Sequence, residues 1–468
     1  MGTGTVERTQ EYDRPAVGHT QQDNHHPAQP GHQHWLSRNW LIALRPAQPG
    51  HQHWLSRNRL IAANAAFTVY ATALAVDTGH ADRTWAIWAA VGYGLTTAIL
   101  VLTRRRNLPV LIPLLVSLAG ALAAPVTWLV TRVAPTPEVQ VISRSAVLLL
   151  QHGSPYLPAG QLDTWLSYNP YLPVMAVFGL PKALGAAGLF GDPRLWLTVV
   201  SVTLIWAAFA IAAPHRHCDS CRQNVVLSTV FIAASPVIAF PLAVGITDPP
   251  VIALMFVTLA LIARPSNLRH AAVALGVACA MKATAWPAVP VFTAMLAARD
   301  AAKAAWRFLG VTLVVAVVLA AALAPAALTD PYAFLQNIVL FPLGLSKHKT
   351  PAASPLPGHL LAMTGMAGHW AAVGLLLAGG LGFAISLIVR PPLDAPAVAW
   401  RLALGLAVMF TLAPATRWGY FVYPIGLVGW LVLTRRPSTA GQDPGQSGIA
   451  SLGMPAQAGK QGLAANAR

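Results

Sequence analysis

Long apolar stretches recur through most of this chain, and they restrict its possible folds more than any other feature. Between residues 60 and 434 they repeatedly reach about 20 residues, the length that a helix needs to cross the roughly 30 Å hydrocarbon core of a bilayer. Only 10% of the residues are charged, and the mean hydropathy is +0.55. Soluble domains have about a quarter of their residues charged. The sequence therefore predicts an all-α fold, a polytopic bundle of transmembrane helices.

The apolar stretches predict about 12 spans. We place them at residues 60–76, 85–103, 109–132, 194–213, 223–243, 248–264, 268–282, 285–299, 306–327, 368–389, 398–414 and 418–434. Arginine and lysine then fall in loops on one side, which the positive-inside rule assigns to the cytoplasm. The formal charge of +16 has the same origin and does not indicate binding to nucleic acid. We expect a multi-pass protein of the cell membrane with both termini in the cytoplasm.

Two long loops face outward in this topology, at residues 134–193 and 329–367. Part of the first loop, 170–190, is apolar enough to enter the membrane. Three prolines interrupt it, however, and proline removes a backbone donor and disrupts a continuous helix. We expect this stretch to lie at the outer surface or to dip partly into the bilayer.

The chain divides into a transmembrane domain, residues 59–434, and two polar tails, 1–58 and 435–468. The tails cannot bury a core and are predicted to be disordered. The first contains a near-perfect duplication, with 27–43 repeated at 46–62. It lacks an apolar segment of the kind found in a cleavable signal peptide. Its histidines could bind a metal or could simply belong to a disordered tail; they are His25, His26, His32, His34, His51 and His53.

Glu138 is the only glutamate after residue 11, and it opens the first outer loop. Apolar residues recur after it at helical spacing, which predicts an amphipathic helix lying in the membrane interface. Thr136 can cap that helix, and Pro137 suits its first position. Glu138 could serve only to stabilise the helix dipole, by a few tenths to about 1 kcal/mol. Alternatively, it is the base of an outward-facing active site, for which the loop offers few other carboxylates.

Other charged residues also have two interpretations each. Asp248 and Asp330 precede prolines at predicted helix starts, where each could be an N-cap or could contact a substrate. Lys282 lies between two short helices and could either extend toward lipid headgroups or bind a lipid phosphate. His348, Lys349 and Arg417 could hold an anionic leaving group, although exposed cations near headgroups are common.

The segment 215–221 contains histidine, cysteine and aspartate at close spacing. It could bind zinc or could be a basic, reduced cytoplasmic loop. The chain has three cysteines, too few for a disulfide framework. No phosphate-binding Gly-Lys-Ser/Thr loop or dinucleotide glycine motif is present, so ATP or NAD chemistry is not expected. We expect neither a metal nor a cofactor at the active site.

The order of several short motifs resembles that of bacterial GT-C glycosyltransferases, especially family 87, the polyprenol-phosphate-mannose-dependent mannosyltransferases. The motifs of the first outer loop are Glu138, Gly153-Ser154-Pro155-Tyr156 and Tyr168-Asn169-Pro170-Tyr171. The later ones are Lys282 with Pro287 and the segment Pro414-Ala415-Thr416-Arg417-Trp418-Gly419-Tyr420. The resemblance covers residues 109–434. Family members more often have Asp at the position of Glu138, and His at that of Gly419.

This resemblance implies a GT-C-like fold and an inverting transfer of a hexose, with mannose as the default sugar. The donor would be a polyprenyl-phosphate-linked sugar, and the acceptor a lipid or a glycan at the outer face. Glu138 would be the catalytic base, and cationic groups would stabilise the leaving phosphate. The implied substrate-binding residues are Arg144, Tyr156, Tyr168, Asn169, Asp248, Lys282, His348, Lys349 and Arg417.

Two other classes of function remain open at this point. One is a multi-pass transporter of a lipid or small solute, although the sequence has no clear inverted repeat and few ionisable residues deep in its spans. The other is a membrane scaffold without enzymatic activity, which would need neither Glu138 nor the outer loop.

Overall fold

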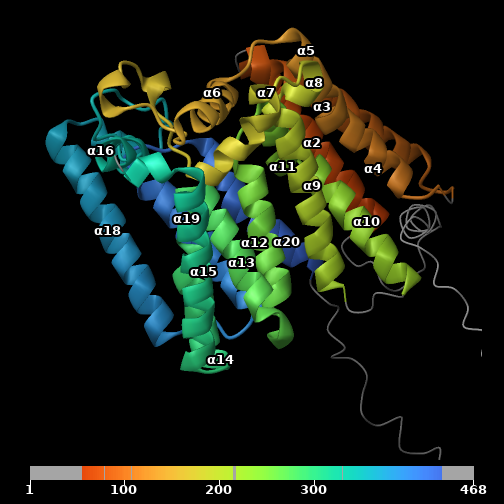
Figure 1. The fold of residues 1–468 in the computed structure, drawn as a ribbon. Coiled ribbons are helices and arrows are strands. Elements are labelled where there is room, and N and C mark those ends of the chain that lie inside the picture. Colours follow the sequence, from red (N-terminus) through yellow and green to blue (C-terminus); the bar gives the residue numbers. More distant parts are fainter. Residues whose placement is uncertain (1–54, 78–79, 107, 214–217, 329, 435–468) are drawn as a thin grey trace, which may run out of the picture.

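A computed structural model describes residues 55–77, 80–106, 108–213, 218–328 and 330–434 (Figure 1). The described part is a helical bundle, as predicted, with a single isolated β-bridge between Ala353 and Thr416. Most of the two predicted tails, 1–54 and 435–468, lies outside the described residues, as do the histidines of the first tail.

The N-terminal half contains α2 (Arg57–Asp77), α3 (His80–Leu102), α4 (Leu111–Leu118), α5 (Ala124–Arg132), α6 (Pro137–His152), α7 (Leu180–Ala183), α8 (Gly188–Gly191), α9 (Pro193–Ala212), α10 (Asp219–Ala234) and α11 (Pro236–Val244). The C-terminal half contains α12 (Asp248–Ile262), α13 (Leu268–Met281), α14 (Ala288–Arg299), α15 (Ala302–Leu323), α16 (Pro331–Leu335), α17 (Pro357–Ala362), α18 (Met366–Val389), α19 (Ala395–Leu412) and α20 (Val422–Thr434).

Shorter helical turns connect these elements. They are the π-helices η1 (Ala119–Ala123) and η8 (Gln336–Leu340), and the 3-10 turns η2 (Ala159–Gln161), η3 (Trp165–Ser167), η4 (Pro173–Gly179), η5 (Pro265–Asn267), η6 (Ala283–Ala285), η7 (Pro325–Leu328) and η9 (Trp418–Phe421). In the first outer loop, η4 and α7 occupy the proline-interrupted stretch, so the described structure has no spanning helix between α6 and α9.

Seven helices of the described part are long and apolar enough to cross a membrane. A bent pair, α10 and α11, makes eight if it is one span; its two halves meet at an angle of 56°. Ser235 and Pro236 lie at this bend, where the ring of proline cannot continue a regular helix. Each of the 12 predicted segments contains a helix, but the count of 12 spans is not confirmed, because several of these helices are too short.

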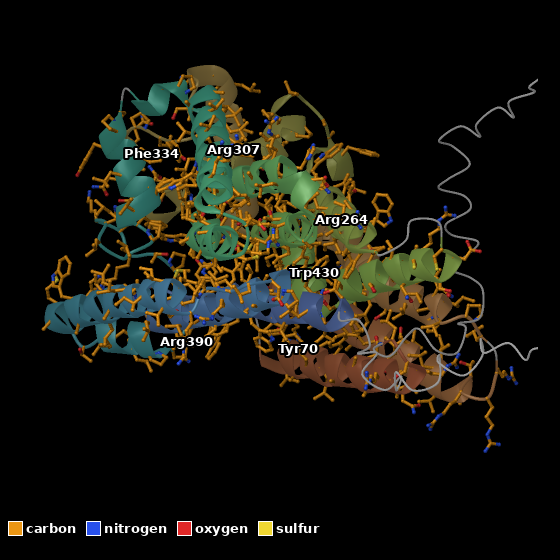
Figure 2. All side chains as sticks on the ribbon, turned by 90° about the horizontal axis from the view of Figure 1, so that it is seen from below. Tyr70, Arg264, Arg307, Phe334, Arg390 and Trp430 are labelled. Atoms are coloured by element: carbon orange, nitrogen blue, oxygen red, sulfur yellow. The ribbon has the colours of Figure 1, made fainter. Side chains whose placement is uncertain are left out.

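Burial differs sharply between the helices. Nearly every residue of α12 is buried, and at the centre of the bundle Trp430 of α20 stacks on Phe256 with ring centroids 5.2 Å apart. By contrast, α18 buries only 11% of its most apolar 18-residue window. Figure 2 shows α18 and Tyr70 of α2 toward the outside and Trp430 further in. Apolar side chains that face outward along such helices suit contact with lipid tails.

The two predicted outer loops lie at the same end of the bundle, around α6 and α16 in Figure 1. They also contact one another directly. The backbone N–H of Asn169 donates to Asn337 Oδ1 at 2.6 Å, and Tyr168 stacks on Phe341 with centroids 4.4 Å apart. The loops therefore form one cap over this end of the bundle.

Candidate active site

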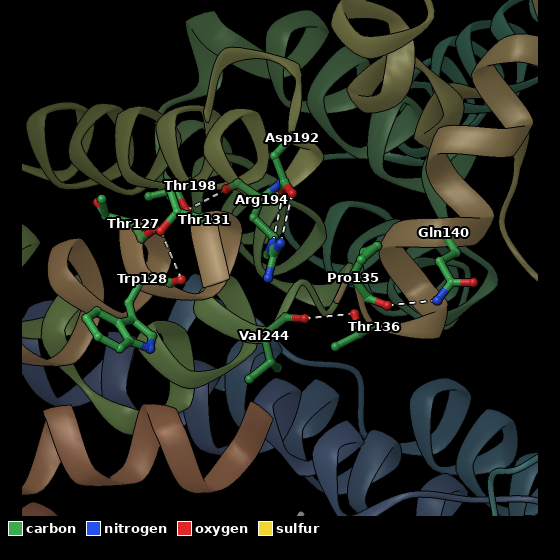
Figure 3. Close-up of polar contacts among 10 residues, drawn as sticks. All are labelled: Thr127, Trp128, Thr131, Pro135, Thr136, Gln140, Asp192, Arg194, Thr198 and Val244. Carbon is green, nitrogen blue, oxygen red and sulfur yellow. Dashed lines mark hydrogen bonds and ion pairs between the residues drawn. The ribbon is translucent and has the colours of Figure 1, made fainter. Parts of the chain in front are cut away.

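The start of α6 is fixed by a loop from a distant part of the sequence. The hydroxyl of Thr136 donates to the carbonyl of Val244 at 2.9 Å, and Gln140 Nε2 donates to the carbonyl of Pro135 at 2.8 Å (Figure 3). The predicted helix is confirmed, with Pro137 in its first position. The predicted side-chain cap by Thr136 is wrong, because its hydroxyl bonds the Val244 carbonyl instead.

Arg194 supports the same junction. Its side chain is only 2% exposed and binds the carboxylate of Asp192 through Nε at 2.9 Å and Nη2 at 2.8 Å (Figure 3). Beside it lies Gly245, whose φ of +90° is easily adopted only by glycine. A Cβ at this position would overlap Val139 of α6 and lie 3.1 Å from Arg194 Cγ. The 244–248 loop therefore packs tightly against the helix that carries Glu138.

Replacing Gly245 by alanine is expected to lower the free energy of unfolding by about 1–3 kcal/mol, because the new methyl group meets both a strained φ and an overlap. Unfolding in detergent, followed by circular dichroism, measures this change. Gly310→Ala is the matched control, because a Cβ there meets nothing within 4 Å. Equal stability of the two variants would contradict the tight packing.

A cavity of about 430 Å³ opens between this junction and the loop cap. Its polar wall consists of Glu138, Tyr168, Tyr171, Thr247, Asp248, Lys282, Thr284, Thr350, Arg417 and Tyr420. Most of the remaining wall is apolar and includes Trp165, Ile338, Val339, Phe341, Leu376 and Phe410. The cavity thus combines a few convergent charged groups with apolar surroundings, as ligand sites usually do.

Glu138 forms an ion pair with Arg417 across the cavity, joining side chains 279 positions apart in the sequence. The β-bridge positions the arginine: Thr416 N–H donates to the Ala352 carbonyl at 3.0 Å, and Ser354 N–H donates to the Thr416 carbonyl at 2.9 Å. Burial lowers the pKa of Arg417. Glu138 and nearby tyrosine side chains raise this pKa by more than burial lowers it, so the net shift is upward. The guanidinium is therefore a fixed positive charge beside the carboxylate.

A second ion pair lies deeper. Lys282 Nζ is 2.5 Å from Asp248 Oδ1 and donates to Thr247 Oγ1 at 3.2 Å. It also lies over the rings of Tyr171 and Tyr420, at 5.6 and 5.5 Å from their centroids, which are cation–π distances. The side chains of Lys282 and Asp248 are only 10% and 1% exposed.

This second pair corrects two of our interpretations. Lys282 does not extend toward headgroups, because its ammonium is held inside the protein by Asp248. Asp248 is not a side-chain N-cap, since α12 begins without a capping bond and the carboxylate binds Lys282 instead. For Asp330 the predicted N-cap is confirmed: its carboxylate accepts a hydrogen bond from the N–H of Ala333 at 2.9 Å.

The structure brings five of the predicted site residues to the cavity wall: Glu138, Tyr168, Asp248, Lys282 and Arg417. Asn169 lies behind the wall. It is 3% exposed, and its amide bonds Ser145 and the Pro155 carbonyl, so it holds the loop. Arg144 likewise donates to the carbonyls of Leu166 and Ser167 at 2.7 and 3.0 Å, and burial lowers its pKa.

The other three predicted residues do not line this cavity. Tyr156 donates to the carbonyl of Tyr171 at 2.9 Å and lines a second cavity. His348 lies edge-on to Tyr168, with centroids 6.3 Å apart, while Lys349 is exposed on the same loop. Tyr156 and His348 thus contact wall residues of the main cavity, Tyr171 and Tyr168, without lining it themselves.

Five polar wall residues were missing from the predicted set: Tyr171, Thr247, Thr284, Thr350 and Tyr420. Tyr171 and Tyr420 lie within the motifs that carry the family resemblance, and Thr247 immediately precedes Asp248. Their adjacency to predicted residues was a usable signal. It could not, however, reveal that the two tyrosine rings flank one ammonium group.

No group of three or more histidine, cysteine or acidic side chains in the described part of the chain could hold a metal ion. In the proposed zinc segment 215–221, His215 and His217 lie outside the described residues. Cys218 and Cys221 are described, and neither forms a disulfide within the described residues.

No protein-family model matches this chain, and no curated protein matches it at a significant level. Among solved structures it is similar to the crystal structure of ArnT from Cupriavidus metallidurans bound to undecaprenyl phosphate, at 17% identity and a TM-score of 0.44. The match covers 68% of this chain and 59% of that one, so it spans less than two thirds of the length of ArnT. At this level of similarity we draw no conclusion from the match.

The fold and the cavity together define the class of protein to which this chain belongs. The part of the chain that the structure describes is a helical membrane protein, with seven or eight helices suited to crossing the bilayer and a charged cavity at one end of the bundle.

Proposed function

We propose that this protein is an integral membrane glycosyltransferase of the GT-C type. It would move a hexose, with mannose as the default sugar, from a polyprenyl-phosphate donor to a lipid or glycan acceptor. The reaction would take place at the extracytoplasmic face of the cell membrane, with both termini in the cytoplasm. The motif order supports this assignment, and the geometry of the cavity supports the chemistry.

The observation that carries the proposal is the set of charges in the cavity. Two carboxylates line it, but they differ in access: the side chain of Glu138 is 16% exposed, whereas that of Asp248 is 1% exposed and bound to Lys282. Only Glu138 can meet an incoming hydroxyl group without breaking a buried pair. A base must come within hydrogen-bond distance of the proton that it removes, and this requirement favours Glu138 over Asp248.

The apolar walls suit a donor carried on a lipid. Leu376 belongs to α18, whose other residues are mostly exposed apolar side chains, and it also lines the cavity. The cavity therefore borders the side of the bundle that faces lipid tails. A polyprenyl chain could remain among those tails while its phosphate approaches Arg417.

In the proposed step, Glu138 accepts the proton of the acceptor hydroxyl group as its oxygen forms a bond to the anomeric carbon. The bond from that carbon to the phosphate oxygen breaks, and the phosphate leaves with the electron pair. Arg417 would stabilise the growing charge on the phosphate. In turning toward the phosphate, Arg417 would release the Glu138 carboxylate with which it pairs in the structure.

The full chain in proteoliposomes tests this proposal, with radiolabelled polyprenyl-phosphate sugars as donors and an extract of membrane glycolipids as acceptors. Label is expected to move from the donor to an acceptor. Arg417→Gln should lower kcat/KM for the donor about 10–100-fold, because a charge-assisted hydrogen bond contributes about 1.5–3 kcal/mol. Uptake of a labelled solute into the vesicles without any transfer of sugar would contradict the proposal and would favour a transporter.

A further inference from the structure

A second cavity, of about 270 Å³, lies where the two outer loops meet. Its walls come from the end of α6, the segment 154–161 and the residues around α16. The loops are joined at its edge: the N–H of Ala326 donates to the carbonyl of Gly153 at 3.4 Å, and the N–H of Ala159 to Asp330 Oδ2 at 3.4 Å. The recess is therefore formed by tertiary contacts and is not a property of either loop alone.

The cavity combines aromatic rings with varied hydrogen-bonding groups. Tyr156 and Phe334 form an edge-to-face pair with centroids 5.7 Å apart. The polar lining consists of the hydroxyl of Ser154, the imidazole of His152, the amide of Gln161 and the carboxylate of Asp330. The side chains of His152 and Gln161 are exposed and make no hydrogen bond within the described part of the chain, so both are available to a ligand.

This lining discriminates between classes of ligand. An anion would be repelled by Asp330, while a cation would find only this one carboxylate, whose oxygens already accept bonds from Ala333 and Ala159. An apolar tail would leave the side chains of His152 and Gln161 without hydrogen-bond partners, at a cost for each. A neutral ligand with many hydroxyl groups both donates and accepts, which matches an amide, an imidazole and a hydroxyl group. That ligand is a saccharide.

The two cavities lie far apart along α6. Glu138 is in its first turn and His152 is its last residue, so 14 steps at 1.5 Å per residue separate them by about 21 Å. A single hexose cannot occupy both places, so a ligand that reaches both must be an oligosaccharide.

We propose that the recess around Tyr156, Gln161 and Asp330 is a subsite for the glycan portion of the acceptor, remote from the atoms that react. This inference rests on the proposed glycosyltransferase activity and adds to it a class of acceptor: a neutral oligosaccharide several residues long. The subsite would hold the far part of the acceptor while its terminal hydroxyl group reaches Glu138.

Direct binding tests the subsite independently of catalysis. The full chain in detergent is exposed to an array of immobilised neutral hexose oligomers, α- and β-linked and one to six units long. We expect at least one oligomer to be retained, and longer ones more strongly than the monosaccharide. Gln161→Ala and His152→Ala should each weaken that binding about tenfold. Asp163→Ala, an exposed residue of the same loop outside both cavities, should leave it unchanged.

The outcomes separate the subsite from the proposed function. Retention of no oligomer, or equal binding by Gln161→Ala and Asp163→Ala, would overturn the subsite even if sugar transfer is observed. Retention that depends on Gln161, in a protein that transfers no sugar from any polyprenyl-phosphate donor, would support a saccharide site and overturn the transferase. Thermal unfolding of each variant shows whether a loss of binding reflects a loss of fold.

Discussion

Replacing Glu138 by glutamine is expected to lower the rate of sugar transfer by about 10²–10⁴-fold, the usual contribution of a general base. Glutamine preserves the size of the side chain and can still bond Arg417, but it cannot take a proton from the acceptor. The effect should fall on kcat more than on donor KM, because the amide leaves the cavity open. Transfer of label in proteoliposomes measures both constants.

Two controls separate this chemistry from a structural role. Asp163→Asn removes a carboxylate in the same way from an exposed position outside both cavities, and it should leave transfer unchanged. Glu138→Asp retains a base but shortens its reach, so part of the activity should remain. If Glu138→Gln transfers sugar at the rate of the unmodified protein, the assignment of Glu138 as base is wrong.

Replacing Lys282 by methionine is expected to lower the free energy of unfolding by about 3–5 kcal/mol, because it leaves the carboxylate of Asp248 buried without a counter-charge. The carboxylate is 1% exposed, so water cannot replace the lost ammonium. Unfolding of the purified protein in mixed detergent micelles, followed by circular dichroism, measures the loss.

The double variant Lys282→Met with Asp248→Asn is the matched control. It removes both charges, and replacing a whole buried ion pair is often nearly neutral for stability. We therefore expect it to regain most of the stability that the single variant loses. If the double variant is as unstable as Lys282→Met alone, the pair does not account for the loss.

The helical bundle could be predicted from the sequence because apolar length is a strong signal. Each of the 12 predicted segments contains a helix, and the amphipathic helix predicted to begin at Pro137 is also present. The number of spans could not be settled in the same way. Hydropathy does not reveal that one apolar stretch is divided at Ser235 and Pro236 into two helices whose axes differ by 56°. It also does not reveal that α14 has only 12 residues.

The individual residues of the site could be predicted from the sequence, but the ion pairs that they form could not. Glu138 could be identified because it is the only glutamate after residue 11. Lys282 and Arg417 could be identified because they lie in the motifs that carry the family resemblance. The partners depend on tertiary contacts: the β-bridge brings Arg417 to Glu138, and the packing of α12 on α13 brings Asp248 to Lys282. Local rules alone favoured a cap for Asp248, and the neighbouring ammonium group overrode that preference.

The helices α12 and α13 have 15 and 14 residues, and α15, which packs along α13, has 22. The difference of 8 residues from α13 corresponds to about 12 Å at 1.5 Å per residue. At the opposite end, Arg299 donates to the carbonyl of Ile262 at 3.3 Å, which places the end of α12 beside the turn before α15. The ends that carry Asp248 and Lys282 are therefore recessed relative to the far end of α15, and the floor of the cavity lies below it. Within a hydrocarbon layer of roughly 30 Å, a carrier lipid would not have to rise into the water to present its headgroup; the hydroxyl group of the acceptor would instead have to descend to it.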